Sequence, residues 1–311
     1  MSTVFLGTSE FAATILTRLA GSDAHRPALV LTRPDRPRGR GRRLASPPVA
    51  TRARALGIPL EQPASVNDPG ARELIARAGH AVGGELAGQG GAQTVIVCAF
   101  GALIKEPLLS EHEILNVHPS LLPRWRGAAP IERAIMAGDS QTGVSIIHLT
   151  AGLDSGPVCL TASEAIRLDD TYGSLSARLA EIGGELLLRA LEDAPAFLEQ
   201  AEQGVTYAEK IGPEDRLLDP ARPAAEAERV VRALHPHIGA RVALPDGSLL
   251  GVHRAALLHS PAIGAGVTAR DGRLLLDCSP GVLELIEVQP PGGRAMDSAS
   301  FLRGHAPPGR R

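Results

Sequence analysis

The sequence predicts an α/β domain with a doubly wound, mostly parallel sheet, followed by a small domain of β-barrel type. Two observations support this fold class. Up to about residue 200, short apolar runs alternate with longer segments of helical periodicity, which is typical of strands and helices that alternate along a parallel sheet. Beyond that point, short apolar runs follow one another between Gly, Asp and Pro turns, which is typical of a barrel.

Composition sets the limits within which this prediction holds. At 311 residues the chain is long enough for one large or two smaller domains. Because only 3% of the residues are aromatic, aliphatic side chains must fill the core. The net charge of −2 gives no overall attraction to nucleic acid, so any such contact must be local. We expect a cytoplasmic protein for three reasons. The three cysteines are far apart and form no CxxC pair, which is typical of reduced cysteines. No apolar run approaches the roughly 20 residues of a membrane span, and the N-terminus has no basic region typical of a signal peptide.

In the first part of the chain, each predicted strand is an apolar run bounded by Gly, Pro or polar residues. The run 94–99 is apolar throughout, which indicates a strand buried on both faces of a parallel sheet. The predicted strands are 4–6, 28–32, 58–60, 94–99, 114–117 and 143–149. Apolar periodicity together with N-cap residues or a proline in the first turn predicts helices at 9–19, 47–56, 67–77, 127–137 and 171–191, and a helical segment from Lys105.

The second part begins with a proline-rich stretch that surrounds one short amphipathic helix, predicted over 224–234. The apolar runs that follow predict strands at 241–244, 249–252, 266–268, 274–276 and 281–288. Strands this short, joined by tight turns, favour a small all-β barrel.

Residues 33–47 form an arginine-rich segment between the second strand and the next helix. Its prolines and glycines argue against regular structure, so we expect a long exposed loop. A solvated, mobile surface segment is the simplest interpretation. The loop is longer than a connection requires, however, and arginine beside glycine suits a phosphate backbone. The candidate nucleic-acid contacts are Arg36, Arg38, Arg40, Arg42 and Arg43.

The most informative residues lie around the strand predicted at 114–117. Asn116 and His118 are two residues apart, so they point to the same side, at the C-terminal end where α/β sheets bind ligands. An amide and an imidazole, with a carboxylate from Asp154, suit the stabilisation of an oxyanion during proton transfer. The alternatives are buried structural polar groups for Asn116 and His118 and an ordinary turn aspartate for Asp154.

These residues also carry a family resemblance. Asn116-x-His118, then Ser120-Leu121-Leu122-Pro123 and Arg126-Gly127, and later Gly152-Leu153-Asp154-Ser155-Gly156, resemble the signature of the 10-formyltetrahydrofolate-dependent formyltransferases. The unbroken run 123–131 is similar to the branch that formylates initiator methionyl-tRNA.

The resemblance implies a Rossmann-like catalytic domain over 1–190 with a tRNA-contact loop at 33–47. It further implies a linker over 191–207 and an OB-like tRNA-binding domain over 208–311. It is weakest after about residue 239. His235 and His237 flank Pro236 and could be a metal pair, but no third ligand is evident, so we interpret them as loop residues and predict no metal.

The resemblance also implies an activity, the transfer of the formyl group of 10-formyltetrahydrofolate to the methionine amine of initiator methionyl-tRNA, bound through its acceptor arm. Asn116 and His118 would donate to the oxyanion, and Asp154 would orient His118 and help to remove the amine proton. Ser120, Leu121, Leu122 and Pro123 would form a wall of the folate site. We expect a cytoplasmic monomer with no membrane contact.

Two alternatives remain. The chain could be a relative that formylates a small amine, such as a nucleotide sugar or glycinamide ribonucleotide, or that hydrolyses formyltetrahydrofolate. The arginine-rich loop and the C-terminal domain argue against these enzymes. It could instead be a non-catalytic tRNA-binding relative, against which the joint presence of Asn116, His118 and Asp154 argues.

Overall fold

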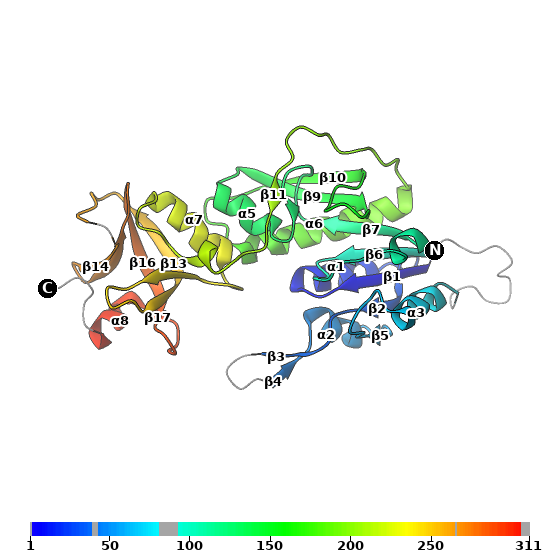
Figure 1. The fold of residues 1–311 in the computed structure, drawn as a ribbon, viewed down its shortest axis with the longest axis horizontal. Coiled ribbons are helices and arrows are strands. Elements are labelled where there is room, and N and C mark those ends of the chain that lie inside the picture. The colour runs from blue at the N-terminus through cyan, green and yellow to red at the C-terminus, as the bar shows by residue number, and fades with distance from the viewer. Residues whose placement is uncertain (1, 39–42, 81–92, 265, 306–311) are drawn as a thin grey trace. The chain divides into compact units, whose positions relative to one another are not determined.

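A computed structural model describes residues 2–38, 43–80, 93–264 and 266–305 (Figure 1). Its larger sheet has seven strands in the order β10-β9-β7-β6-β1-β2-β5. The pairs β1–β2, β1–β6, β2–β5 and β6–β7 are parallel, and β7–β9 is antiparallel. The strands are β1 Ser2–Gly7, β2 Pro27–Leu31, β5 Leu60–Glu61, β6 Gln93–Cys98, β7 Glu113–His118, β9 Gln141–His148 and β10 Val158–Ala165. The predicted doubly wound, mostly parallel sheet is confirmed.

Helices cover both faces of this sheet because its inner strands are apolar on both sides. On one face, Ile75 of α3 packs in a buried cluster with Val4 and Leu6 of β1. On the other face, Gly183 of α6 lies against Val117, Ile15 of α1 and Val144. The helices are α1 Glu10–Ala20, α2 Pro48–Ala55, α3 Pro69–His80, α4 Leu108–Glu111, α5 Pro130–Ala137 and α6 Tyr172–Asp193.

The N-terminus of α1 shows how local sequence sets an element boundary. Ser9 is the N-cap, and its hydroxyl accepts a hydrogen bond from the Ala12 amide at 3.3 Å. One of the backbone N–H groups that a helix start leaves unpaired is thereby satisfied. The start of the helix predicted over 9–19 is confirmed.

The arginine-rich segment departs from its prediction. The expectation that proline and glycine exclude regular structure is wrong, because β3 (Arg36–Arg38) and β4 (Arg43–Ala45) pair as an antiparallel hairpin. Pro37 pairs opposite Leu44. A two-stranded ribbon has only edge strands, and an edge strand tolerates a residue without a backbone N–H.

The C-terminal part is a curled antiparallel sheet in the order β12-β13-β16-β15-β14, and β17 also pairs with β16. Its strands are β12 Ala240–Ala243, β13 Leu249–Leu258, β14 Gly266–Arg270, β15 Arg273–Asp277, β16 Val282–Gln289 and β17 Met296–Asp297. The sheet closes as a half-barrel over a core that includes Val231 of α7 (Ala224–Leu234) and Phe301 of α8 (Ser298–Gly304). The predicted strands and the helix at 224–234 are confirmed, whereas α8, which Asp297 caps, was not predicted.

By backbone contacts the chain forms two compact units. The first contains residues 1–128, 142–164 and 176–207, and the second contains 129–141, 165–175 and 208–311. Within the second unit, Arg133 of α5 donates to both carboxylate oxygens of Asp215 at 2.6 and 2.9 Å. The predicted boundaries at 190 and 208 stay a prediction.

Among the residues described, no helix is both long and apolar enough to cross a membrane. Three further short elements are β8 Arg126–Gly127, β11 Tyr207–Ala208 and the 3-10 turn η1 Glu214–Arg216.

Candidate active site

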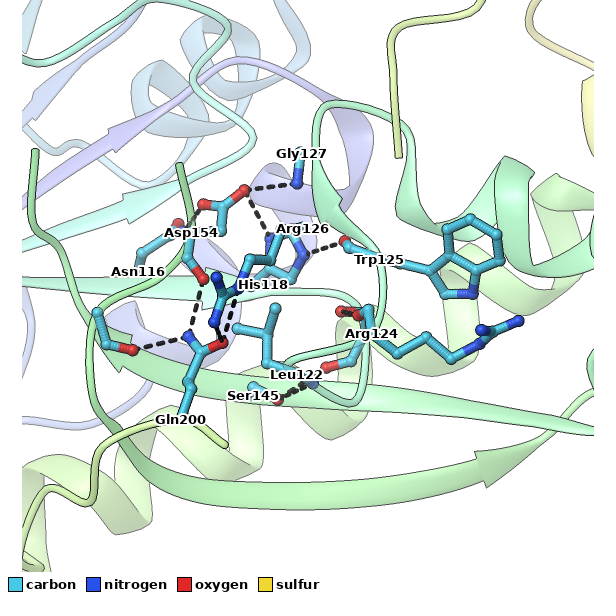
Figure 2. A network of polar contacts seen from close by, with 12 residues as sticks. Asn116, His118, Leu122, Arg124, Trp125, Arg126, Gly127, Ser145, Asp154 and Gln200 are labelled. Atoms are coloured by element: carbon cyan, nitrogen blue, oxygen red, sulfur yellow. Dashed lines mark hydrogen bonds and ion pairs between the residues drawn. The ribbon is translucent and has the colours of Figure 1, made fainter. Parts of the chain in front are cut away.

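The three predicted catalytic residues come together at the C-terminal end of β7 (Figure 2). Asn116 and His118 are 8% and 4% exposed, so their polar groups need partners within the protein. Asp154 supplies them from the loop after β9. Asn116 Nδ2 donates to Asp154 Oδ1 at 3.3 Å, and His118 Nδ1 lies 3.6 Å from Asp154 Oδ2. As the strand periodicity predicted, the side chains of Asn116 and His118 point to the same side of β7.

A backbone contact fixes the tautomer of His118. Its Nε2 lies 2.9 Å from the carbonyl oxygen of Trp125. A carbonyl oxygen can only accept a hydrogen bond, so Nε2 must carry the hydrogen. The other ring nitrogen, Nδ1, faces the Asp154 carboxylate. The sequence did not predict Trp125 at the site, but its carbonyl lies closer to the His118 ring (2.9 Å) than the Asp154 carboxylate does (3.6 Å).

The Asp154 carboxylate is held from a second direction. The amide of Gly127 donates to Oδ2 at 2.8 Å, the same oxygen that faces His118. Both Asp154 (φ 42°) and Trp125 (φ 64°) have left-handed backbone conformations. Such conformations cost about 1–3 kcal/mol for residues with a side chain and persist where the surrounding structure enforces them, which is common at functional sites.

Two residues of the segment predicted as a linker contribute to the site. The Gln200 side chain donates to the carbonyls of Asp154 and Gly156 at 2.8 and 2.7 Å. The Thr206 hydroxyl accepts from the Trp125 amide at 2.9 Å. The sequence carries no signal for either contact, because both partners are far away along the chain and the segment has no periodicity.

One glycine in the Asp154 loop, Gly156, is required for space. A Cβ atom on Gly156 would lie 1.9 Å from the carbonyl oxygen of His148, closer than any real contact. On Gly152 a Cβ atom would lie 2.2 Å from the Ser155 hydroxyl oxygen, which can rotate away. The loop therefore runs too close to the backbone at the end of β9 for a side chain at position 156.

The predicted folate wall, Ser120 to Pro123, follows β7 directly. Ser120 is fully buried, and its hydroxyl donates to the Arg124 carbonyl at 2.6 Å. The Leu122 amide donates to the Ser145 hydroxyl at 3.2 Å. Leu121, Leu122 and Pro123 are half-buried. In the structure Ser120 thus shapes the turn, and the three residues after it are the ones accessible to a ligand.

The predicted nucleic-acid arginines divide by position. Arg36 begins β3 and is exposed, and Arg38 and Arg43 are opposite each other in the hairpin. Arg40 and Arg42 lie outside the described residues. At the base of the hairpin, Asp35 accepts from Gln62 Nε2 at 2.8 Å and from the Ser46 hydroxyl at 2.9 Å. These two hydrogen bonds lower the pKa of Asp35 below its ordinary value.

A cavity of about 330 Å³ lies beside this hairpin. Its lining includes Thr8 after β1, Phe100 after β6, and Arg33 and Arg36. In the sheet, β2 lies on one side of β1 and β6 lies on the other. The order of strands therefore reverses between β1 and β6. Ligands of open α/β sheets bind outside the carboxyl ends of the strands at such a point.

No group of three or more His, Cys, Asp or Glu side chains with metal-binding geometry occurs in the described parts of the chain. His237, which the sequence left without a role, pairs through Nε2 with Glu132 at 2.9 Å. Burial raises the pKa of the Cys278 thiol to about 11, which disfavours a nucleophilic thiolate.

Comparisons with known proteins agree on one family. The family described as formyl transferase matches residues 1–191, and its C-terminal domain matches 210–306. A methionyl-tRNA formyltransferase of Dechloromonas aromatica is 40% identical over 98% of this chain and 96% of its own length. The methionyl-tRNA formyltransferase of Methylococcus capsulatus is 41% identical over 100% of this chain and 99% of its own length. In fold, the chain resembles HypX from Aquifex aeolicus in complex with tetrahydrofolic acid (TM-score 0.65, 16% identity), covering 96% of this chain and 46% of that one.

Proposed function

We propose that this chain, which belongs to the formyl transferase family and to its methionyl-tRNA formyltransferases, transfers a formyl group from 10-formyltetrahydrofolate to initiator methionyl-tRNA. The meeting of Asn116, His118 and Asp154 at the end of β7 carries the proposal. The methionine amine attacks the formyl carbon, and a tetrahedral oxyanion forms. The bond from that carbon to N10 then breaks, and the proton lost by the amine is returned to N10.

Asn116 is the proposed oxyanion donor. Its side-chain amide has two N–H groups, and the hydrogen bond to Asp154 uses one of them. That bond also orients the amide, so that the second N–H has a fixed direction before substrate arrives. A donor fixed in advance stabilises developing negative charge without reorganisation.

His118 and Asp154 are the proposed proton carriers. With Nε2–H held by Trp125, the neutral ring offers only the lone pair of Nδ1 to the amine proton, directly or through a water. Once the ring is protonated, Nδ1–H can serve as the second donor to the oxyanion. The Asp154 carboxylate lies 3.6 Å from Nδ1 and so faces the proton that the ring accepts.

The remaining substrate contacts are proposed from position and charge. Leu121, Leu122 and Pro123 are accessible beside the catalytic residues and form an apolar wall suited to the folate ring. The exposed Arg36 and the arginines of its hairpin suit the phosphates of the acceptor arm. The proposed reaction uses no metal, and the protein is proposed to act as a cytoplasmic monomer.

The test is single-turnover formylation of charged initiator methionyl-tRNA, with wild type, Asn116→Ala and Arg36→Ala side by side. We expect Asn116→Ala to slow the chemical step about a hundredfold to a thousandfold at saturating substrate, because one oxyanion donor is lost. If wild type consumes the formyl donor only with a nucleotide-sugar amine, the acceptor is wrong. If it transfers no formyl group to any amine, the proposal fails.

Arg36→Ala should weaken binding of the tRNA and leave the saturated rate unchanged, because a phosphate contact contributes affinity rather than chemistry. The dependence of the binding constant on salt should also become shallower, by about one unit of slope in a logarithmic plot. An unchanged affinity at low and high salt would exclude the hairpin as a tRNA contact.

A further inference from the structure

We propose that Gln200 is a positioning residue for formyl transfer, which holds the Asp154 loop in its reactive geometry. This inference rests on the proposed function of the site. It concerns the segment 191–207, which the sequence predicted only as a linker. Figure 2 shows the Gln200 side chain between Arg126 and the backbone of the Asp154 loop.

The Gln200 amide uses both of its ends. Its Nε2 donates to the carbonyl oxygens of Asp154 at 2.8 Å and Gly156 at 2.7 Å. Its Oε1 accepts from Nε and Nη2 of Arg126 at 2.9 and 2.7 Å. Carbonyl oxygens only accept and a guanidinium only donates, so the chemistry of the partners leaves one orientation for the amide.

The loop requires such support. Asp154 has φ 42°, a left-handed backbone conformation that persists in a residue with a side chain only where the surrounding structure holds it. Gln200 joins the carbonyl of this residue to the carbonyl two positions later, and so holds the turn from its backbone. The Gln200 amide therefore positions the Asp154 carboxylate through the backbone, without contacting the carboxylate itself.

Three contacts depend on where that carboxylate lies. It accepts from Asn116 and from the Gly127 amide, and it faces Nδ1 of His118. If the loop moves, the oxyanion donor and the proton acceptor both lose their alignment. A misplacement of about 1 Å in a catalytic constellation lowers rates by up to about a hundredfold.

The experiment compares Gln200→Leu and Gln200→Glu with wild type. Leucine removes both ends of the amide. Glutamate keeps the acceptor for Arg126 but, when ionised, cannot donate to the two carbonyls. The measured quantities are the single-turnover rate at saturating substrates, the half-saturating concentrations of methionyl-tRNA and 10-formyltetrahydrofolate, and the thermal midpoint.

The matched control is Gln289→Leu. Gln289 is also half-buried and also bridges a side chain and a backbone carbonyl, bonding His253 and Gly293 in the C-terminal sheet domain. It therefore reports what the loss of such a bridge does to stability alone.

We expect both Gln200 variants to lower the saturated rate about tenfold to a hundredfold, with half-saturating concentrations within about twofold of wild type. Gln289→Leu should lower the thermal midpoint similarly and leave the rate unchanged. A wild-type rate for Gln200→Glu would show that only the Arg126 contact matters and would overturn the proposal, as would a wild-type rate for Gln200→Leu. If wild type itself transfers no formyl group, the proposed function fails and takes this inference with it.

Discussion

At the scale of single residues, the site is a chain of contacts in which each group is oriented by another. Trp125 fixes the tautomer of His118, Gly127 holds the Asp154 carboxylate, and that carboxylate orients Asn116. Each link joins a side chain to the backbone or to another side chain at close range. Changes that only displace the backbone should therefore reduce catalysis without touching a catalytic group.

Gly156→Ala tests this expectation. The added methyl group would lie 1.9 Å from the His148 carbonyl oxygen, so the Asp154 loop must shift. We expect the single-turnover rate to fall at least about tenfold and the free energy of unfolding to fall by about 1–3 kcal/mol. Urea unfolding monitored by circular dichroism measures the second quantity.

Gly70→Ala is the matched control, because nothing lies within 4 Å of a Cβ atom at that position in α3. It should leave the rate unchanged and alter stability by no more than about 1 kcal/mol, with alanine the better helix residue. Equal rates for the two glycine variants would contradict the role assigned to the Asp154 loop.

At the scale of elements, one ion pair joins α5 to the turn η1 inside the second unit. Arg133 donates to both carboxylate oxygens of Asp215, and the Gly212 amide donates to one of them at 2.8 Å. The Arg133 hydrogen bonds, the largest influence, lower the pKa of Asp215 below its ordinary value. Only the ionised carboxylate can accept all of these donors, so the attachment of η1 depends on pH.

The sign of that dependence follows from the lowered pKa. The stabilisation is complete above the unfolded pKa of about 3.9 and is lost as the pH falls through the lower folded pKa. Asp215→Asn should therefore reduce the free energy of unfolding by about 1–3 kcal/mol at pH 7, and the difference should shrink below about pH 4. Urea midpoints at pH 7 and pH 3 measure both values.

Asp169→Asn serves as the control, because Asp169 is exposed and lies in the same unit. Its effect should stay within about 0.5 kcal/mol at either pH. A penalty for Asp215→Asn that is as large at pH 3 as at pH 7 would show that the ion pair is not its source.

At the scale of the whole molecule, the two compact units do not follow simple cuts in the sequence. The second unit includes α5, which lies far before the C-terminal sheet in the chain. Arg229 of α7 donates to the carbonyl of Met136 in α5 at 3.0 Å, and Met136 packs against the core of the C-terminal sheet. Much of what covers α5 is therefore supplied from beyond residue 207.

A chain truncated after Tyr207 tests the predicted boundary directly. Because α5 would lose α7 and the partner of Arg133, we expect the fragment to bind a hydrophobic dye and to unfold at lower urea than the whole chain. A fragment that unfolds as cooperatively as the whole chain, without dye binding, would instead support independent domains divided near residue 208.

The sequence by itself determined most of the helices and strands and the faces of the strands. Asn116 and His118 share a side because strand side chains alternate, and the helix at Ala224–Leu234 ends where its apolar periodicity ends. Such signals are local, since each depends on residues a few positions apart. The expectation that proline and glycine exclude regular structure was wrong at Arg36–Arg38. It overlooked that both strands of a hairpin are edge strands, which tolerate proline.

Only the tertiary structure decided how the site is held. Gln200 and Asp154 are 46 positions apart, and Thr206 and Trp125 are 81 apart. Their contacts join side chains to backbone groups, which every residue has, so no residue type marks the partner in the sequence. Which carbonyls receive the Gln200 amide, and which nitrogen of His118 is held by a backbone carbonyl, depend on how distant segments pack together.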